Sequence, residues 1–411
     1  MKILRCAAYI ICGAYIKLRS VIVMIYLDHG ATTRTAPEAV TAMQEYWEKQ
    51  YGNPSGVYEF AGESKKAVER VREQIAESLG ALPEEIYFTG GGTESDNWAI
   101  KGMAAMHPEG GHIITSQIEH HAVLHTCKFL EQRGYSVTYL DVDERGMVST
   151  KELEKAIRDD TFLISIMFAN NEIGTLQPVE EIGKIAKKHG ICFHTDAVQA
   201  YLHVPFQVNQ MGISMLSASS HKFHGPKGVG FLYIRKGIEI ENLLHGGGQE
   251  KRKRSGTENV PGIVGMGKAV ELKMQNLRQD IGYVKKLRNY MLERLFREIP
   301  YIRLNGESQK RLPGNINVSF QFVEGQSLLV MLDMEGICAS AGSACTSGDK
   351  GISHVLSAIG LREDLARGTL RFTLGTDNTK EEIDEVIEHL KVMVADLREF
   401  SDDYQSIKVG Y

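Results

Sequence analysis

Short apolar runs alternate with helical patterns along the first half of the chain, and this alternation limits the possible folds more than any other feature. Strand-like runs occur at residues 113–115, 137–140, 163–166 and 192–193. Strands that alternate with helices form a mostly parallel sheet with helices on both faces. Binding sites in such α/β folds lie at the carboxyl ends of the strands. The sequence therefore predicts an α/β fold with a site along that edge.

Polar clusters stand where the predicted strands end. They occupy residues 119–121, 170–172, 196–199 and 219–222. A single histidine after a strand is usually structural, but polar clusters at four strand ends are harder to explain by packing alone. We therefore expect these clusters to meet in one site.

Two of the clusters contain the residue types that pyridoxal phosphate (PLP) requires. Lys222 lies between two histidines and before a Gly-Pro turn, and Asp196 follows the strand at 192–193. Taken alone, such a Lys-His pair is more often part of a solvated loop. PLP needs a lysine for its aldehyde and an acid for its pyridinium nitrogen. Together, Lys222 and Asp196 favour a PLP site.

Three consecutive glycines at 90–92 stand between a strand at 86–88 and a predicted helix. Glycines let backbone N–H groups approach an anion, and a helix N-terminus adds partial positive charge. The spacing fits neither a P-loop nor a dinucleotide-binding motif. A plain strand-to-helix turn explains the glycines equally well until other parts of a phosphate site join them.

A second, smaller α+β domain is predicted after the sheet. A long helical pattern over 261–297 leaves the first domain. Beyond it, strands are predicted at 315–320, 337–340 and 369–373, with helices at 326–335, 353–360 and 380–397. A chain of 411 residues is longer than one core usually supports. We predict a large domain at 34–274 and a small domain formed by 24–33 and 275–411.

Cys345 stands within a run of small residues at 339–348. A small buried cysteine in a tight turn is the commoner fate of a free thiol. A core would, however, surround such a cysteine with apolar bulk, and this run has little to pack. An exposed thiol in such a segment is a plausible nucleophile that moves with its loop.

The cysteines indicate a cytoplasmic protein without a zinc motif, and the overall charge does not suggest a nucleic-acid partner. The chain has six cysteines, and no pair has CxxC spacing, so we expect free thiols in a reducing compartment and no zinc site. The net charge is −5, which does not suggest nucleic-acid binding. The one dense basic cluster, at 251–254, is interpreted as a solvated loop.

Residues 1–23 contain an apolar run of about eleven residues, which is too short to span a bilayer. Lys17 and Arg19 follow it without a clear cleavage site, and a second methionine, Met24, precedes the first predicted strand. We interpret residues 1–23 as an upstream extension that is not part of the fold. A genuine targeting segment is the alternative, and no membrane association is expected.

Taken in order, the motifs resemble those of the class V, fold-type I PLP-transferases, and among them the cysteine desulfurases of the NifS/IscS type. The resemblance covers residues 25 to 398. The motifs that carry it are Gly-Asn-Pro-Ser at 52–55, Thr-Glu-Ser-Asp-Asn at 93–97, Asn-Asn-Glu-Ile-Gly at 170–174, His-Thr-Asp-Ala at 194–197, His-Lys at 221–222, Arg-Ser-Gly-Thr at 254–257 and Ser-Ala-Gly-Ser-Ala-Cys at 340–345.

The resemblance assigns four residues to the cofactor ring. Lys222 would hold PLP covalently and later move the substrate proton. Asp196 would pair with the pyridinium nitrogen, and Gln199 would hydrogen-bond the ring oxygen. His120 would stack on the ring and act as acid and base.

The resemblance also implies a phosphate site and a homodimer. The phosphate would lie at the N–H groups of Gly92 and Thr93, near the hydroxyls of Thr93 and Ser219 and the ring of His221. In this family the threonine of the Arg-Ser-Gly-Thr turn reaches the phosphate of the partner subunit. Here that threonine is Thr257.

The implied substrate is L-cysteine. Arg371 would bind its carboxylate, with Asn171 beside it. Cys345 would attack the sulfur, so that L-alanine and a Cys345 persulfide form and the sulfur passes to an acceptor protein for iron–sulfur cluster assembly or thiolation. The alternatives are another class V enzyme, such as a selenocysteine lyase or a small-substrate aminotransferase, and a non-catalytic scaffold.

The chain departs from the usual family pattern at two places. His29-Gly30 stands where relatives often have Asn-Ala or a similar pair, and residues 350–352 stand where many have Leu-Glu-Pro. His29 would either touch the cofactor pocket or serve as a structural turn residue. The second departure affects loop rigidity and the choice of partner.

Overall fold

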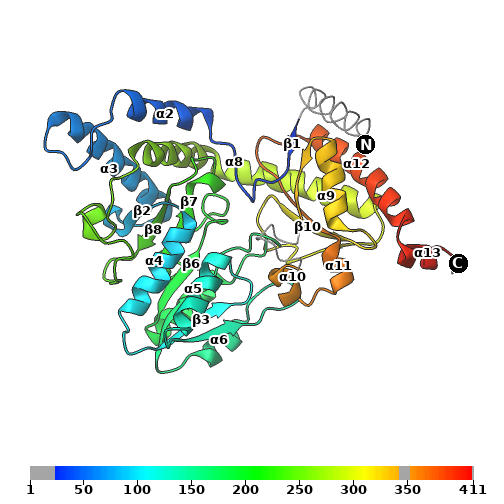
Figure 1. Ribbon diagram of the computed structural model, residues 1–411, viewed down its shortest axis with the longest axis horizontal. Helices are drawn as coiled ribbons and strands as arrows, with labels where there is room; N and C mark the ends of the chain where they lie inside the picture. The colour runs from blue at the N-terminus through cyan, green and yellow to red at the C-terminus, as the bar shows by residue number, and fades with distance from the viewer. Residues whose placement is uncertain (1–23, 342–351, 410–411) are drawn as a thin grey trace, which may run out of the picture.

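The computed structural model describes residues 24–341 and 352–409, which form a larger part around one sheet and a smaller C-terminal part around another (Figure 1). The segments 1–23, 342–351 and 410–411 lie outside the described residues, and with them the predicted N-terminal extension and Cys345. Among the described residues, none of the helices combines the length and the apolar character needed to cross a membrane.

The larger part is built on a seven-stranded sheet in the order β2-β8-β7-β6-β5-β3-β4. All neighbouring strands are parallel except β8, which runs antiparallel to both β2 and β7. The strands are β2 (Ile86–Thr89), β3 (His112–Ser116), β4 (Ser136–Leu140), β5 (Thr161–Ser165), β6 (Cys192–Asp196), β7 (Met215–Ser219) and β8 (Gly230–Ile234). The predicted α/β class and the predicted mainly parallel sheet are confirmed.

Helices cover both faces of this sheet. One apolar cluster joins the sheet to α3 (Glu59–Leu79), α7 (Val179–His189) and the start of α8 (Val260–Glu298), and another joins it to α4 (Gly92–Ala105) and α5 (His121–Glu131). Helix α3 buries Val68, Val71 and Ile75, which recur at helical spacing on one stripe. The larger part also contains α2 (Pro37–Glu48) and α6 (Thr150–Ala156).

Helix α8 connects the two parts. It has 39 residues, which at 1.5 Å per residue gives about 58 Å, and Figure 1 shows it running from the large sheet to the C-terminal part. The side chain of Asn259 caps its first turn by accepting a hydrogen bond from Gly262 N at 3.1 Å. Its first third packs in the core of the large sheet, and Val284 to Leu295 pack in the second core.

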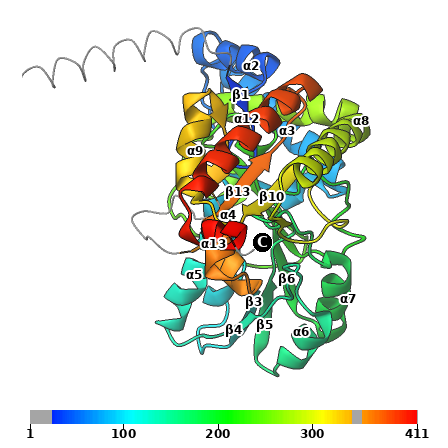
Figure 2. The same cartoon turned by 90° about the vertical axis from the view of Figure 1, so that its right-hand side faces the viewer.

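The second core belongs to a four-stranded antiparallel sheet in the order β12-β13-β10-β9. A short parallel pair, β1 with β11, brings the start of the described chain into the same core. Helices α9 and α12 lie side by side on this part in Figure 2 and contact each other. Its elements are β1 (Ile25–Tyr26), β9 (Ile302–Leu304), β10 (Asn315–Phe320), α9 (Gly325–Met334), β11 (Ile337–Cys338), β12 (Ser340–Ala341), α10 (His354–Ala358), α11 (Glu363–Arg367), β13 (Thr369–Thr373), α12 (Lys380–Glu399) and α13 (Asp402–Val409).

The pairing of β1 with β11 agrees with the assignment of residues 24–33 to the C-terminal part, although the proposed domain boundaries stay a prediction. The single strand predicted at 337–340 is divided in the structure between β11 and β12, which pair with different partners.

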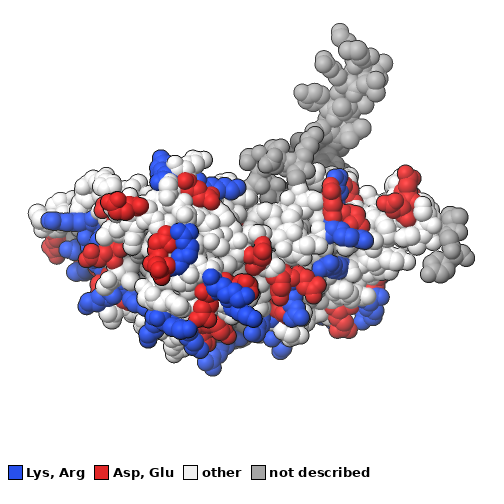
Figure 3. Space-filling model, turned by 90° about the horizontal axis from the view of Figure 1, so that it is seen from below, with Lys and Arg blue, Asp and Glu red and all other residues white. Residues whose placement is uncertain are grey.

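The visible charges of Figure 3 alternate in sign, and basic side chains form no continuous stripe on the face that it presents.

Candidate active site

A cavity of about 710 Å³ lies at the carboxyl ends of β6 and β7, close to β13 of the second sheet. The four predicted polar clusters each contribute to its lining, as does the glycine run at 90–92. Ten of the predicted site residues line it: Gly92, Thr93, His120, Asn171, Asp196, Gln199, Ser219, His221, Lys222 and Arg371. The strand-end rule therefore located the cavity from the sequence.

Lys222 ends a 3₁₀ turn (Ser220–Lys222) that follows β7, and its amine lies inside the cavity. Its Nζ donates hydrogen bonds to Gly30 O and Ala31 O, both at 2.7 Å. Burial and the nearby positive charge of Arg371 lower the pKa of Lys222 to about 8. The amine is thus much more often neutral than an exposed lysine, and the neutral form is the nucleophile for an aldehyde.

Asp196 ends β6 and is buried, with an exposed fraction of 6%. Its Oδ1 accepts a hydrogen bond from Val198 N at 2.9 Å. Burial raises the pKa of this carboxyl, while His120 and Lys222 oppose that rise. A carboxylate in this position needs a cationic partner, and a protonated ring nitrogen is such a partner.

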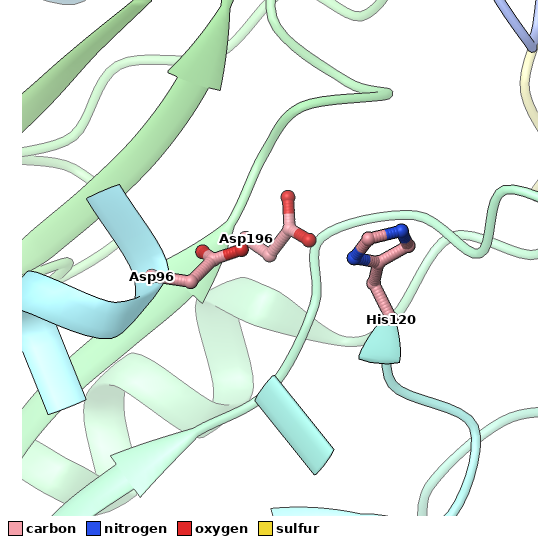
Figure 4. Close-up of side chains that lie close together, drawn as sticks. All are labelled: Asp96, His120 and Asp196. Atoms are coloured by element: carbon pink, nitrogen blue, oxygen red, sulfur yellow. The ribbon is translucent and has the colours of Figure 1, made fainter. Parts of the chain in front are cut away.

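His120 caps α5, because its Nδ1 accepts a hydrogen bond from Ala122 N at 3.2 Å. This bond leaves the proton of the neutral ring on Nε2. Burial lowers the pKa of His120, which favours the neutral ring. Figure 4 shows Asp196 between the His120 ring and a second carboxyl, Asp96.

The three side chains of Figure 4 offer atoms that lie within 4.8 Å of one another, a spacing that a metal ion could also use. All three line the same cavity as Lys222. One neutral histidine and a buried carboxylate beside a lysine amine are the donor set of a PLP ring site, so the residues fit this cofactor.

The glycine run forms the other end of the cavity. Gly91 has φ 145°, a conformation that favours glycine, and a Cβ on Gly92 would come 2.6 Å from Val198 Cγ2. Helix α4 begins at Gly92, and the first N–H groups of a helix lack intrahelical partners. Ser219 and His221 line the same cavity. Burial lowers the pKa of His221 to about 4, so its ring is neutral. The unpartnered N–H groups at the start of α4 make this end of the cavity suit a phosphate group.

Arg371 enters the cavity from β13. Its guanidinium donates to Asn171 O at 3.0 Å, to Asp28 Oδ1 at 2.8 Å and to Ser340 Oγ at 3.0 Å. Its Nε is buried and has no hydrogen-bond partner among the described residues. Only one of the two N–H groups of Nη1 is used in these contacts, so the group keeps donor capacity for the carboxylate of a small ligand.

Gln199 also faces the cavity, and its Nε2 donates to Gly30 O at 2.9 Å. This is the carbonyl that Lys222 contacts.

His29, in contrast, does not line the cavity. Its ring packs edge-on against Tyr26 with centroids 5.1 Å apart, and a Cβ on Gly375 would lie 2.5 Å from the ring. The structure therefore favours a structural turn role for His29.

Two predicted site residues are not in the lining of this cavity. Thr257 borders a separate cavity of about 160 Å³ together with Gly90 and Arg254. Arg254 forms an ion pair with Glu94 at 2.8 Å, and Glu94 accepts from Gly90 N at 2.7 Å, so the loop of Thr257 is tied to the glycine run. Cys345 lies outside the described residues.

The described residues on both sides of the segment 342–351 contact the cavity wall. Before it, Ser340 pairs with Arg371 in the sheet and hydrogen-bonds it. After it, His354 Nε2 lies 3.0 Å from Glu119 O, next to His120. Cys345 follows Ser340 by five residues, and five residues of extended chain span at most about 17 Å.

Sequence reasoning missed two carboxyls of the site. Asp28 pairs with Arg371, which follows it by 343 residues, and no local pattern could connect them. Asp96 follows Thr93 by one helical turn and lines the cavity. The sequence of α4 is only weakly amphipathic, so it gave no signal that Asp96 lies on the buried side of that helix.

The fold and this donor set define a PLP-dependent enzyme of fold type I. Residues 25–386 match the aminotransferase class-V family, to which the chain belongs. Within that family the chain groups with the cysteine desulfurases. It is 55% identical over 378 residues to cysteine desulfurase IscS of Methanosarcina thermophila, and the aligned region covers 92% of this chain and 93% of the relative.

Solved structures agree with this assignment. A NifS-like protein superposes with a TM-score of 0.86 at 40% identity and covers 91% of this chain and 100% of its own. SspA in complex with cysteine superposes with a TM-score of 0.77 at 40% identity and covers 86% of this chain and 100% of its own. The predicted PLP dependence and the resemblance to the NifS/IscS type are confirmed.

Proposed function

We propose that this cysteine desulfurase converts L-cysteine to L-alanine in the 710 Å³ cavity and transfers the sulfur to Cys345. The observation that carries the proposal is that the described residues before and after the segment of Cys345 contact the cavity wall, Ser340 through Arg371 and His354 through Glu119. The solved relative with bound cysteine supports the choice of substrate.

In this proposal each side chain has a defined role. PLP, when bound, supplies an electron sink for the substrate carbon atoms. Lys222 holds the cofactor and moves the Cα proton through Nζ, and Asp196 keeps a negative charge at the ring nitrogen. Arg371 binds the substrate carboxylate, with Asn171 beside it. His120 holds a proton at Nε2 that it can give to the substrate.

The sulfur transfer balances without an external oxidant or reductant. The Cys345 thiolate attacks the substrate sulfur, the Cβ–S bond breaks and an S–S bond forms on Cys345. The substrate carbon takes up a proton and leaves as L-alanine. An acceptor protein, either an iron–sulfur scaffold or a thiolation enzyme, then removes the terminal sulfur.

A homodimer and a cytoplasmic location complete the proposal. Thr257 would reach the phosphate of the partner subunit, which explains why it borders a different cavity from the other phosphate residues. Cys127 and Cys192 are buried free thiols, which supports a reducing compartment.

The test compares Cys345→Ser with Cys338→Ser. Cys345→Ser should retain PLP, with an unchanged visible absorbance band, but form no alanine from L-cysteine. Cys338→Ser, which alters a cysteine seven residues earlier, should retain alanine formation. Full alanine formation by Cys345→Ser would instead support the selenocysteine lyase or aminotransferase alternative, in which this thiol is not used.

A further inference from the structure

Asp96 is a buried carboxyl to which the proposed reaction assigns no task. It lies on the first turns of α4 with an exposed fraction of 1%, and its carboxyl points toward that of Asp196 (Figure 4). One oxygen of each carboxyl and a ring nitrogen of His120 lie within 4.8 Å of one another. Asp96 Oδ1 has no hydrogen-bond partner among the described residues.

Two buried carboxylates this close cannot both be ionised at low cost, because their charges repel in a poorly screened interior. Asp196 is the better place for the single negative charge. It receives a hydrogen bond from Val198 N, and it faces the cavity that contains the Lys222 amine and the His120 ring.

Asp96 has a different environment. Its Oδ1 lies 3.6 Å from His194 Nε2, but His194 is occupied on both nitrogens by Ser165 at 2.9 Å and Ser217 at 3.0 Å. A neutral His194 needs one of these serines as donor and the other as acceptor. Burial lowers the pKa of His194 to about 3, so this ring brings no positive charge to Asp96.

The other ionisable groups near Asp96 and Asp196 also favour a proton on Asp96 and a negative charge on Asp196. Glu119, on the loop between β3 and α5, is fully buried, and burial raises its pKa to about 8. Burial, and then the negative charge of Asp196, raise the pKa of Asp96 well above its ordinary value. The positive groups, Lys222 and His120, act on Asp196 and lower its pKa.

We infer that Asp96 is a positioning residue that stays protonated behind Asp196, so that the single negative charge of the carboxyl pair rests on Asp196 and faces the cofactor's ring nitrogen. A carboxylic acid in this position can also donate its proton toward Asp196 and fix the orientation of that side chain. The inference rests on the proposed role of Asp196. It adds a reason why Asp196 keeps its charge despite burial.

The matched variants are Asp96→Asn and Asp96→Ala in the PLP-loaded enzyme. Asparagine is neutral, has nearly the same shape and retains a donor, whereas alanine removes the donor. Asp96→Asn should keep the pH titration of the visible cofactor band within about 0.3 pH unit of the parent protein. Asp96→Ala should shift that titration and lower kcat about ten-fold, the usual effect of losing one hydrogen bond to a charged group.

A direct readout comes from infrared spectroscopy. At pH 7.5 the carbonyl stretch of protonated carboxyls should be present in the parent enzyme, with Glu119 contributing to it because its pKa is raised to about 8, and Asp96→Asn should remove one component of that band. If Asp96→Asn shifts the cofactor titration by a full unit, or leaves the parent-minus-variant difference spectrum without a lost carboxyl component, then Asp96 is ionised and the inference is wrong.

Asp196→Asn separates this inference from the proposed function. If Asp196→Asn retained full activity, the proposed role of Asp196 would be wrong, whereas the infrared band would still report the protonation of Asp96. An unchanged activity of Asp96→Ala with an unchanged titration would overturn the positioning role alone.

Discussion

Arg371 and Asp28 form an ion pair at 2.8 Å that joins β13 to the segment leading from β1 into the large sheet. Both side chains are mostly buried, and 343 residues separate them in the chain. The pair orients the guanidinium before any ligand arrives. In the proposed reaction the substrate carboxylate shares Arg371 with Asp28, so the pair should also set how tightly the substrate binds.

Arg371→Lys should raise KM for L-cysteine at least about 50-fold, since lysine lacks the planar fork that binds a carboxylate through two parallel bonds. The cofactor band should remain, because Arg371 has no proposed contact with the ring. Steady-state kinetics and an absorbance spectrum check both outcomes. Arg367→Lys, an exposed arginine paired with Glu363 at 2.6 Å, is the control and should leave KM unchanged.

Asp28→Asn should lower KM for L-cysteine, because the substrate carboxylate then competes with a neutral amide rather than a carboxylate. The expected change is about 2- to 10-fold, the size of one partly screened charge contact. A higher KM in Asp28→Asn would show that orientation of Arg371 by Asp28 outweighs competition.

Uptake of PLP by the apoprotein should become faster as the pH rises toward 8. The pKa of Lys222 is lowered to about 8, and only the neutral amine reacts with the aldehyde. Below that pH, each unit of acidity should slow the uptake about ten-fold, and above pH 9 the rate should level off. Stopped-flow absorbance measures this rate, and Lys222→Ala should give no covalent band.

The Arg371 charge offers an internal check on this pH dependence. Arg371 is one cause of the lowered pKa of Lys222, so Arg371→Leu should move the midpoint of PLP uptake to higher pH. A midpoint that stays fixed would contradict the electrostatic coupling between these two side chains.

Thr257 should act across the subunit interface. Lys222→Ala and Thr257→Ala homodimers should both be impaired, but a mixed dimer of the two contains one site with an intact Lys222 and an intact Thr257. Co-refolded mixtures should therefore regain activity above the mean of the separate variants. Activity no higher than that mean would place Thr257 in its own subunit's site or in no site.

Glu250→Gln should destabilise the loop at 250–257 and the fold around it. Glu250 holds Arg72 through two contacts, at 2.8 and 2.7 Å, and accepts from Phe88 N at 2.8 Å, all of them buried. Removal of the carboxylate charge leaves the buried Arg72 with Glu69, a half-exposed carboxylate at 3.2 Å, as its remaining ionic partner, at a cost of up to about 3–5 kcal/mol. Chemical denaturation measures this free energy of unfolding.

An exposed ion pair provides the control for that experiment. Glu63 pairs with Lys66 at 2.8 Å on the surface of α3. Glu63→Gln should leave the free energy of unfolding nearly unchanged, because water screens this pair. Equal effects at Glu250 and Glu63 would contradict the importance of burial at Arg72.

The sequence predicted the parts of the site that local patterns control. The apolar runs before His120 and Asp196 predict their strands, and parallel strands bring their carboxyl ends to one edge. Lys222 was indicated by its polar cluster, although the strand before it, β7, was not predicted. The contact of Asp28 with Arg371 depends on how two distant segments meet, so it required the structure. The position of Asp96 depends on which side of α4 faces β7, a rotation that the weakly amphipathic sequence of that helix does not specify.

The most direct test of the account follows the sulfur atom. The PLP-loaded enzyme is mixed with ³⁴S-labelled L-cysteine without an acceptor, and its peptides are then analysed by mass spectrometry under non-reducing conditions. The account predicts one added ³⁴S on the peptide that contains Cys345, one alanine released for each persulfide in the first turnover, and neither product in Cys345→Ser. Release of alanine with free sulfide and no label on Cys345 would contradict it.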